Sequence, residues 1–422
     1  MKLLTAAAMV AALLGLARPQ CFSGQDDFSV NSNIPLTSSD LSGISDFGFE
    51  LYRQLAAPSS PENFFFSPYS IWTAFTLAYF GTGGETAAQL RRVLMVGDKA
   101  ATLRLWRELD AKYQRRQANT KAYKFTVANR AFIENTLPIR ACISDLLKKE
   151  VEKVNFAETL PLVAHINNFA SASTNGRIPT IVSGNDLSDA LMVLVNAAYF
   201  KGTWQYLFNA RATRPREFYV SPGVSVVTPM MKQTASLRYG EFDNLAARVL
   251  ELPYAGGAMS MFLLLPLDDG PQGFANMATK LNGNNVRAVT LGKNLFKKDV
   301  DLLLPKFKLE QTVSEALIPA LQNMGITDIF SSRKVDLTDF GPLRNITVDK
   351  VIHKAFVEVN EEGTEAAAVT AAILVFKSAS SHRDDLPVQF HCNRPFIFFI
   401  QDNDTRNILF MGAYKNPATA TR

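Results

Sequence analysis

Apolar residues follow a helical period in two early parts of the chain. One face of residues 44–55 and one face of residues 99–116 carry them at three- and four-residue spacing, which predicts two amphipathic helices. Ser45 or Asp46 is the expected N-terminal cap of the first helix. The apolar positions are Ile44, Phe47, Leu51 and Leu55 in the first stretch, and Leu103, Trp106, Leu109 and Tyr113 in the second.

Short runs of branched and aromatic residues dominate the chain after residue 190. Each run is bounded by Gly, Pro, Asn or Asp, which predicts β-strands. The runs read ALMVLVNAAYF, RVLELPY, SMFLLLPL, VDLLLPKFKL, AFVEVN, FIFFIQD and ILFMGAY. Helical patterns come mostly first and strands mostly later, with no Gly/Ser linker and no repeat, which predicts an α+β fold in one large domain.

The N-terminus reads MKLLTAAAMVAALLGLARPQC. Lys2 precedes an apolar run over residues 3–16, and Gly15 and Ala17 are small, as a signal peptidase requires. We therefore predict a signal peptide over residues 1–17, a loose extension over 18–40, and a secreted, extracellular protein. The run is shorter than the roughly 20 residues that span a bilayer, and no later run is longer, so no membrane association is expected.

Composition changes this picture little. The 422 residues carry a formal charge of +5, too weak to indicate nucleic-acid binding. Three cysteines, Cys21, Cys142 and Cys392, allow one disulfide in an oxidising compartment, and the sequence does not select the pair. Asn345 and Asn403 match the N-glycosylation pattern.

Motifs of catalysis are absent from the sequence. There is no HExxH, CxxC or EF-hand pattern, and no GxSxG elbow, so neither an enzyme, a metal site nor a cofactor is predicted. The glycine-rich GTGGET at 81–86 lacks the Lys-Ser/Thr of a phosphate loop, and we interpret it as a turn between helices.

Several phrases together resemble the serpin family over residues 41–417. They are NFFFSPYSI (63–71), LVNAAYFKGTW (194–204), TPMMKQ, LELPY, LLLPKF, VNEEGTEAAAVT (359–370) and NRPFIFF…ILFMGAYKNP, all in the family's order. The resemblance implies three β-sheets, about nine helices and an exposed reactive loop, here 361–390, joined to the large central sheet.

The resemblance also implies roles for polar residues around that sheet. Ser67, Ser70, Asn196 and His353 would form the cluster where its strands part. Trp204 would lie at the top of the sheet, where the loop enters, and Glu361 would pair there with Lys306. A helix cap, a core tryptophan and ordinary satisfied buried polar groups remain the alternative interpretation.

The start of the loop has the composition of a strand that inserts late into a packed sheet. Alternate side chains of a strand share a face, so Thr364, Ala366, Ala368 and Thr370 would form a small inner face, with Glu365 on the outer one. Gly363 supplies backbone freedom for the hinge. A tolerant surface loop is the alternative interpretation.

The family's spacing from Gly363 places the reactive bond at Lys377–Ser378. Lysine fits the pocket of a trypsin-like protease, whose serine would form an acyl-enzyme at the Lys377 carbonyl. The segment after Lys377 is longer than usual, so Arg383–Asp384 is the alternative bond. Chymotrypsin-like or subtilisin-like targets stay open through Phe376 or a second cleavage point, and the physiological protease is not predicted.

Three functions compete at this point. The first is a monomeric secreted inhibitor that forms a covalent complex with a trypsin-like serine protease. The second is a non-inhibitory serpin acting as carrier, storage protein or chaperone, which the small inner face of the hinge disfavours. The third adds binding of a sulfated, heparin-like polysaccharide (a glycosaminoglycan) by basic residues around 104–124, which Glu108 and Asp110 interrupt; a solvated helix face is the alternative. The basic residues are Arg104, Arg107, Lys112, Arg115, Arg116, Lys121 and Lys124.

Overall fold

The computed structural model describes residues 21, 38–56, 60–291, 294–343, 345–364 and 386–420. The predicted signal peptide 1–17 and both candidate reactive bonds lie outside these residues. Within the described ranges, no helix is both long and apolar enough to cross a membrane.

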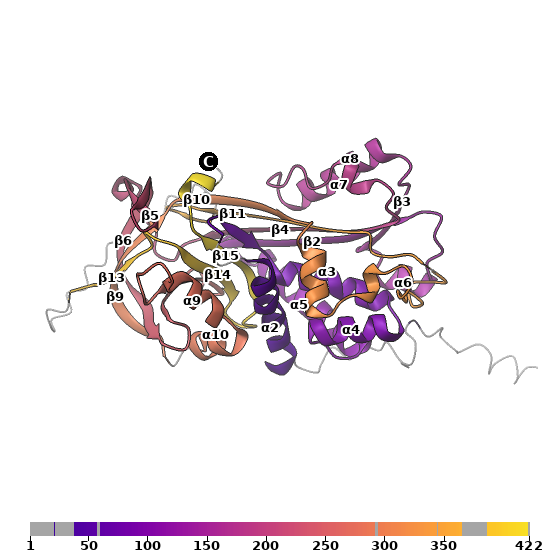
Figure 1. Ribbon diagram of the computed structural model, residues 1–422, viewed down its shortest axis with the longest axis horizontal. Coiled ribbons are helices and arrows are strands. Elements are labelled where there is room, and N and C mark those ends of the chain that lie inside the picture. Colours follow the sequence, from indigo (N-terminus) through magenta and orange to yellow (C-terminus); the bar gives the residue numbers. More distant parts are fainter. Residues whose placement is uncertain are drawn as a thin grey trace, which may run out of the picture.

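A six-stranded sheet runs along the long axis of the molecule (Figure 1). Its strands β4 and β11 are parallel, with residues 193–199 paired to 350–356, while the neighbouring β2–β4 and β10–β11 pairs are antiparallel. The strands lie in the order β10 (Phe307–Val313), β11 (Lys350–Val359), β12 (Gly363–Thr364), β4 (Met192–Thr203), β2 (Tyr123–Glu134) and β3 (Val151–Val154).

The remaining strands form a nine-stranded sheet at one end of the molecule. Its 19-residue strand β6 pairs with β5 and β9 along one part and with β7 along another, so two sheet regions are continuous through β6. The strands are β1 (Phe64–Phe66), β5 (Arg214–Ser221), β6 (Val224–Phe242), β7 (Ala247–Pro253), β8 (Met259–Pro266), β9 (Phe296–Pro305), β13 (Val388–His391), β14 (Phe396–Asp402) and β15 (Ile408–Tyr414).

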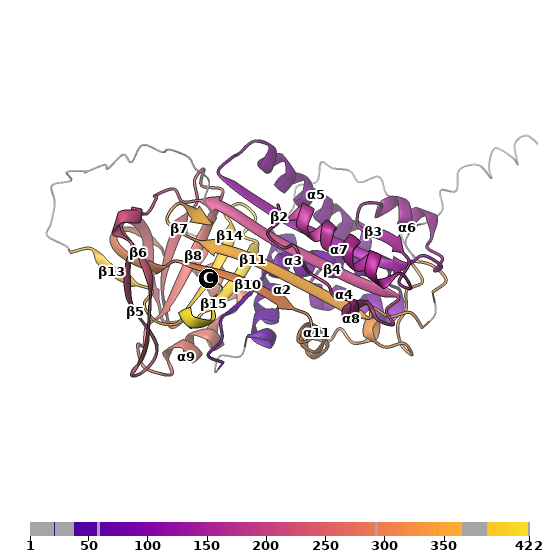
Figure 2. The ribbon, with the colours of Figure 1, turned by 90° about the horizontal axis from the view of Figure 1, so that it is seen from above.

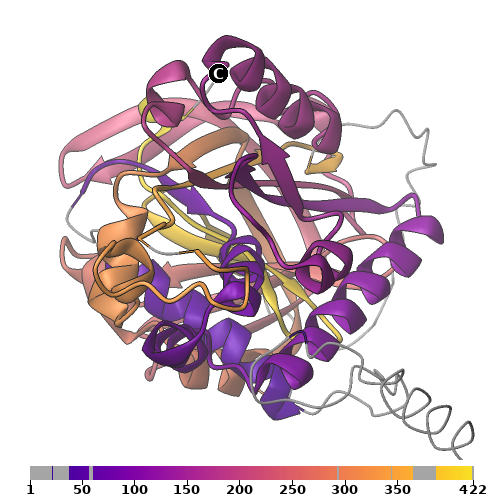
Figure 3. The same ribbon diagram turned by 90° about the vertical axis from the view of Figure 1, so that its right-hand side faces the viewer.

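Ten α-helices in the described residues cover the sheets. Helices α7 and α8 lie across one face of the six-stranded sheet, while α2, α3, α4 and α5 lie on the other (Figures 1 and 2). Figure 3 looks onto the end that carries α4 and α6 and shows helices on both sides of the sheet. The helices are α2 (Ser38–Leu55), α3 (Pro68–Gly81), α4 (Gly84–Leu94), α5 (Lys99–Ala118), α6 (Ala141–Leu146), α7 (Thr159–Ser173), α8 (Gly184–Leu187), α9 (Gly273–Lys280), α10 (Gly283–Thr290) and α11 (Leu317–Met324).

The core is centred on α3, all of whose residues are buried. Pro68 follows the N-cap Ser67, whose side chain accepts a hydrogen bond from the Ser70 amide. A helix that is apolar on every side must lie inside the protein, and α3 packs between α2 and the two sheets. This position brings its polar first turn to the centre of the six-stranded sheet.

The predicted α+β fold is confirmed, but two of the three expected sheets are continuous through β6, and two local predictions are also corrected. The first helix begins at Ser38, inside the predicted extension, so Ser45 and Asp46 are not caps. Their side chains bind other elements: Ser45 donates to the Arg406 carbonyl and Asp46 accepts from Arg287. The run VDLLLPKFKL, predicted as one strand, is divided at Lys306 between β9 and β10, which belong to different sheets.

The other helix and turn predictions are confirmed. Residues 99–116 lie within α5, and GTGGET joins the end of α3 to the start of α4. Each remaining predicted run contributes a strand.

Candidate functional site

The start of the predicted reactive loop forms a strand, β12, at the top of the seam between β4 and β11. Thr364 pairs with Val359 of β11 on one side and with Gly202 of β4 on the other, antiparallel to both. Below this point β4 and β11 pair directly with each other. The loop therefore begins on a path that points into the middle of the sheet.

Gly363 makes the reversal into β12 possible. Its φ is +151°, and a Cβ atom there would lie 1.9 Å from the Gly202 carbonyl oxygen, so a side chain would not fit. Asn360 closes the turn, because its side-chain oxygen accepts from the amides of Glu362 and Gly363. The predicted hinge glycine thus occupies a position that only glycine fills without a clash.

Glu361 fastens the hinge to the surrounding structure. Its carboxylate lies 2.9 Å from Lys306 Nζ and accepts a 2.9 Å hydrogen bond from Thr213 Oγ1. Burial alone would raise the pKa of Glu361, but the bonds from Lys306, the backbone and Thr213 outweigh it and lower the pKa. The predicted Glu361–Lys306 pair is present in the structure.

Trp204 lies at the same end of the seam. Its indole is 1% exposed, stacks on Tyr254 with centroids 4.5 Å apart, and donates from Nε1 to the Asn360 carbonyl at 2.9 Å. Its backbone amide donates to the Glu362 carbonyl. The tryptophan therefore holds both ends of the hinge turn, which a purely apolar core residue would not do.

A buried polar cluster crosses the seam at its middle, and it contains Ser67, Ser70, Asn196 and His353. The Ser67 amide donates to His353 Nε2 at 3.0 Å, so Nε2 has no proton and Nδ1 donates to Asn196 Oδ1. The Asn196 amide nitrogen donates to the Ser70 carbonyl. Burial lowers the pKa of His353 to about 3, so the ring is neutral at physiological pH.

The sequence reasoning missed one member of this cluster, Asn129 of β2. Its Oδ1 accepts from Asn196, and its Nδ2 donates to Thr73 Oγ1. Asn129 and Asn196 are register partners, and Asn196 pairs in turn with His353. The signal that could have found Asn129 is a lone amide inside the strand YKFTVANRAFIE.

The remaining predicted loop residues lie outside the described residues. These are Ala366, Ala368 and Thr370 of the hinge, the bond Lys377–Ser378 and the alternative Arg383–Asp384.

The basic surface of α5 is largely compensated by acids of the same chain. Arg116 binds Asp402 and Asp404, Lys112 also binds Asp404, and Arg107 binds Glu150. Such compensation favours a solvated helix face over a polysaccharide track.

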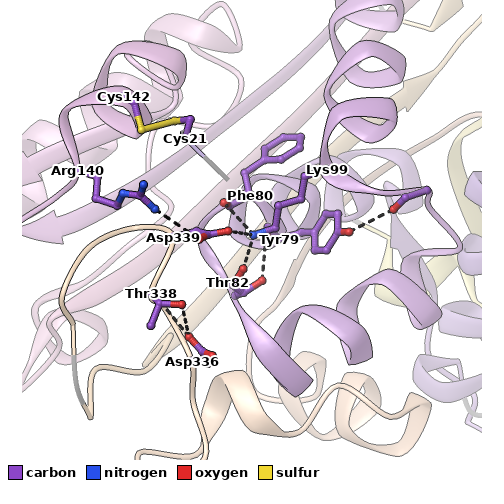
Figure 4. A network of polar contacts seen from close by, with 11 residues as sticks. Cys21, Tyr79, Phe80, Thr82, Lys99, Arg140, Cys142, Asp336, Thr338 and Asp339 are labelled. Atoms are coloured by element: carbon purple, nitrogen blue, oxygen red, sulfur yellow. Dashed lines mark hydrogen bonds and ion pairs between the residues drawn. A yellow bond between two sulfur atoms is a disulfide. The ribbon is translucent and has the colours of Figure 1, made fainter. Parts of the chain in front are cut away.

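One disulfide joins Cys21 to Cys142 of α6 (Figure 4). Cys392 is free and buried. The two candidate glycosylation residues differ in environment. Asn345 is exposed, whereas Asn403 is half-buried and its Nδ2 donates to the Gly257 carbonyl and to Ser260 Oγ.

Comparisons with known proteins agree with this geometry. The sequence model of the family described as "Serpin (serine protease inhibitor)" matches residues 42–417. Human Serpin B3 is 36% identical over 392 residues, which cover 88% of this chain and 97% of that protein. The leukocyte elastase inhibitor of Xenopus laevis is 34% identical, covering 89% and 99%.

A solved structure of human thyroxine-binding globulin complexed with its hormone superposes with a TM-score of 0.79. It is 26% identical and covers 90% of this chain and all of that one. The chain therefore belongs to the serpin family, which the matching model describes as serine protease inhibitors.

Proposed function

We propose that this protein is a secreted, single-use inhibitor of trypsin-like serine proteases, cleaved at Lys377–Ser378. The observation that carries the proposal is the course of β12, which enters the seam between β4 and β11 and is antiparallel to both. A strand that continued along this path would gain two neighbours. The small residues that follow, Ala366, Ala368 and Thr370, suit such a packed position.

The reaction begins as ordinary proteolysis. The protease serine attacks the Lys377 carbonyl, the peptide bond to Ser378 breaks, and an ester joins Lys377 to the protease while Ser378 becomes a new amino terminus. The freed loop then inserts into the seam and carries the protease with it. Inhibition results because insertion distorts the protease before water hydrolyses the ester.

Insertion would replace one strand pairing, between β4 and β11, by two pairings with the inserted strand. The parallel pairing of residues 193–199 with 350–356 would be lost, and antiparallel pairing to both β4 and β11 would replace it. Antiparallel pairs are slightly more stable per residue than parallel ones, and a new row of backbone hydrogen bonds is added. The inserted form is therefore the more stable one.

The polar cluster would act as the gate in this exchange. The hydrogen bond from His353 to Asn196 crosses the seam, so a strand that passes between β11 and β4 must break it. Ser67, Ser70 and Asn196 then need new partners in the widened sheet. Trp204 and the Glu361–Lys306 pair would control the first step at the top of the seam.

Secretion is part of the proposal. A disulfide such as Cys21–Cys142 forms and persists in oxidising compartments, and the N-terminal 17 residues have the pattern of a signal peptide. Lys377 supplies the cationic side chain that the acidic pocket of a trypsin-like protease binds, and Ser378 is small enough for the next subsite.

The test is to incubate the purified mature protein with trypsin and separate the products on a denaturing gel. We expect a boiling-resistant band at the summed mass and a released peptide that begins at Ser378. Lys377→Ala should abolish the band, whereas Arg383→Ala should keep it. A peptide that begins at Asp384 would move the bond, and cleavage without a stable band would favour the non-inhibitory alternative.

A further inference from the structure

Three exposed arginines lie within six residues, and we call them the arginine surface: Arg211, Arg214 and Arg216. Arg211 lies in η1 (Ala210–Ala212), and the other two begin β5. Across the part of the chain that the structure describes, no carboxylate pairs with any of the three. Arg214 donates only to the neighbouring Thr213 carbonyl at 2.9 Å. Their positive charge is therefore available to another molecule.

The arginine surface borders Glu361, at the start of the reactive loop. Thr213, next to Arg214, donates from Oγ1 to the Glu361 carboxylate, and the Phe208 amide donates to the Glu361 carbonyl at 2.9 Å. The strand register also places Arg214 near Lys306, the partner of Glu361. Arg214 pairs with Met230, which pairs with Pro305, the residue before Lys306.

Secondary structure holds this surface in place. Asn209 caps η1 by accepting from the Arg211 amide at 3.0 Å, and β5 pairs with β6 from Arg214 onward. Arg214 and Arg216 are two residues apart on a strand, so their side chains leave the same face. Fixed backbone positions reduce the entropy that a partner must overcome on binding.

From this geometry we infer that the arginine surface is a second contact site for the target protease and selects proteases with an acidic rim around the cleft. The inference rests on the proposed function, because it requires a protease held at the loop. The loop that carries the reactive bond starts at Glu361, beside this surface, so a protease held by the loop would approach the same end of the molecule. Arginine also pairs with carboxylates through two parallel hydrogen bonds, which fixes the orientation of the partner.

A protease fits these observations better than a sulfated polysaccharide. Polyanions gain affinity by contacting many cations along an extended track, whereas this surface has three cations beside the loop. Complementary charge acts mainly on the association rate, and steering raises that rate by about 10- to 1,000-fold at low ionic strength. The expected signature is a salt-dependent rate that differs between proteases of the same cleavage specificity.

The experiment uses anionic and cationic trypsin, which share primary specificity and differ in surface charge. Association rates with the full mature protein are measured at low and high salt for the wild type and for the triple variant Arg211→Ala, Arg214→Ala, Arg216→Ala. The matched control removes three exposed cations from the opposite end of the molecule, where α4 and α6 lie (Figure 1). They are Arg91 in α4, Lys148 after α6, and Arg333 after η2. The short helix η2 (Asp328–Phe330) packs on α4.

We expect the wild type to trap anionic trypsin faster than cationic trypsin at low salt. The arginine variant should lose about tenfold in rate with anionic trypsin only, and the difference should vanish at high salt. The control should keep most of the wild-type rate, although its net charge equals that of the arginine variant.

Equal slowing of the two triple variants would overturn the inference, because net charge alone would then explain the effect. Unchanged rates in the arginine variant would overturn it as well. A rate effect that appears only when heparin is added would replace the protease by a polysaccharide as partner. Failure of every protein to trap either trypsin would instead overturn the proposed function, and this inference with it.

Discussion

The Lys99 ammonium lies 2.5 Å from Asp339 Oδ2, and both side chains are almost completely buried (Figure 4). Lys99 begins α5, whereas Asp339 belongs to the segment between η2 and β11. Lys99 also donates to the Phe80 and Thr82 carbonyls, and Arg140 lies 3.5 Å from Asp339 Oδ1. Burial lowers the pKa of Lys99, and the bond to Asp339 opposes that effect.

Breaking this pair should destabilise the protein strongly. Asp339→Asn leaves two cations without their acid, and removal of one partner of a buried ion pair costs about 3–5 kcal/mol. Lys99→Met should cost less, because Asp339 keeps Arg140 and the apolar stem of the side chain is preserved. Urea-unfolding midpoints of the native form measure both.

The control for this prediction is Arg92→Ala, which removes an exposed pair with Glu85. Surface ion pairs contribute little, so the control midpoint should stay near that of the wild type. If the control and Asp339→Asn had equal midpoints, the buried ion pair would contribute no more to stability than the exposed pair.

His353 makes the native form sensitive to mild acid. In the unfolded chain its pKa is near 6.5, whereas burial lowers the pKa of the folded form to about 3. Below pH 6.5 the unfolded chain therefore binds a proton that the folded chain does not, and stability falls as pH falls. Between pH 7 and pH 5 the loss from this group is about 2 kcal/mol.

Unfolding midpoints at pH 5, 6 and 7 for the wild type and His353→Gln measure this effect. The variant cannot titrate at this position and should show a flatter profile, although its midpoint at pH 7 is lower. His165 and His391 are present in both proteins, so their contributions cancel. Parallel profiles would mean that His353 is not the group responsible.

The inner face of the hinge should tolerate no charge. Ala368→Glu would bury a carboxylate when the loop inserts, so trypsin should cleave this variant without being trapped. Ala367→Glu is the matched control, because it makes the same change one residue away on the outer face. The number of inhibitor molecules consumed per trypsin inhibited measures both, and similar numbers for the two variants would contradict strand insertion.

Glycosylation should distinguish Asn345 from Asn403. A glycan is attached through Nδ2. Asn345 is an exposed residue, whereas Nδ2 of Asn403 donates two 2.9 Å hydrogen bonds. In secreted protein from eukaryotic cells, Asn345→Gln should increase gel mobility, as enzymatic deglycosylation does. Asn403→Gln should leave mobility unchanged and lower the unfolding midpoint. A mobility change in the second variant would contradict this assignment.

Periodicity and family phrases predicted most strands and the residues of the polar cluster. They could do so because the apolar alternation of a strand and the phrases around Ser67, Asn196 and His353 are local in sequence. The start of α2 could not be predicted because residues 38–43 read SSDLSG, and the single apolar residue Leu41 gives no helical period. Lys306 was read as part of one strand because a strand pattern does not reveal a change of sheet.

Contacts between distant, individually ordinary residues could not be predicted. Nothing near Lys99 indicates that Asp339, 240 residues later, neutralises it. The same holds for Asn129, which joins the cluster only through strand register. The three residues of the arginine surface stand close together in the sequence RATRPR (211–216), but its place beside Glu361 depends on the fold.

The Cys21–Cys142 bond sets an order of events during synthesis. In the proposed secretory route, Cys21 enters the oxidising compartment first and waits until another 121 residues have been made. At about 5–20 residues per second this delay is on the order of 6–24 s. Cys392 emerges much later than Cys142, so Cys142 can pair with Cys21 before Cys392 is available. In the folded protein Cys392 is a buried free thiol. In this route, translation order favours the Cys21–Cys142 pair over either pair with Cys392.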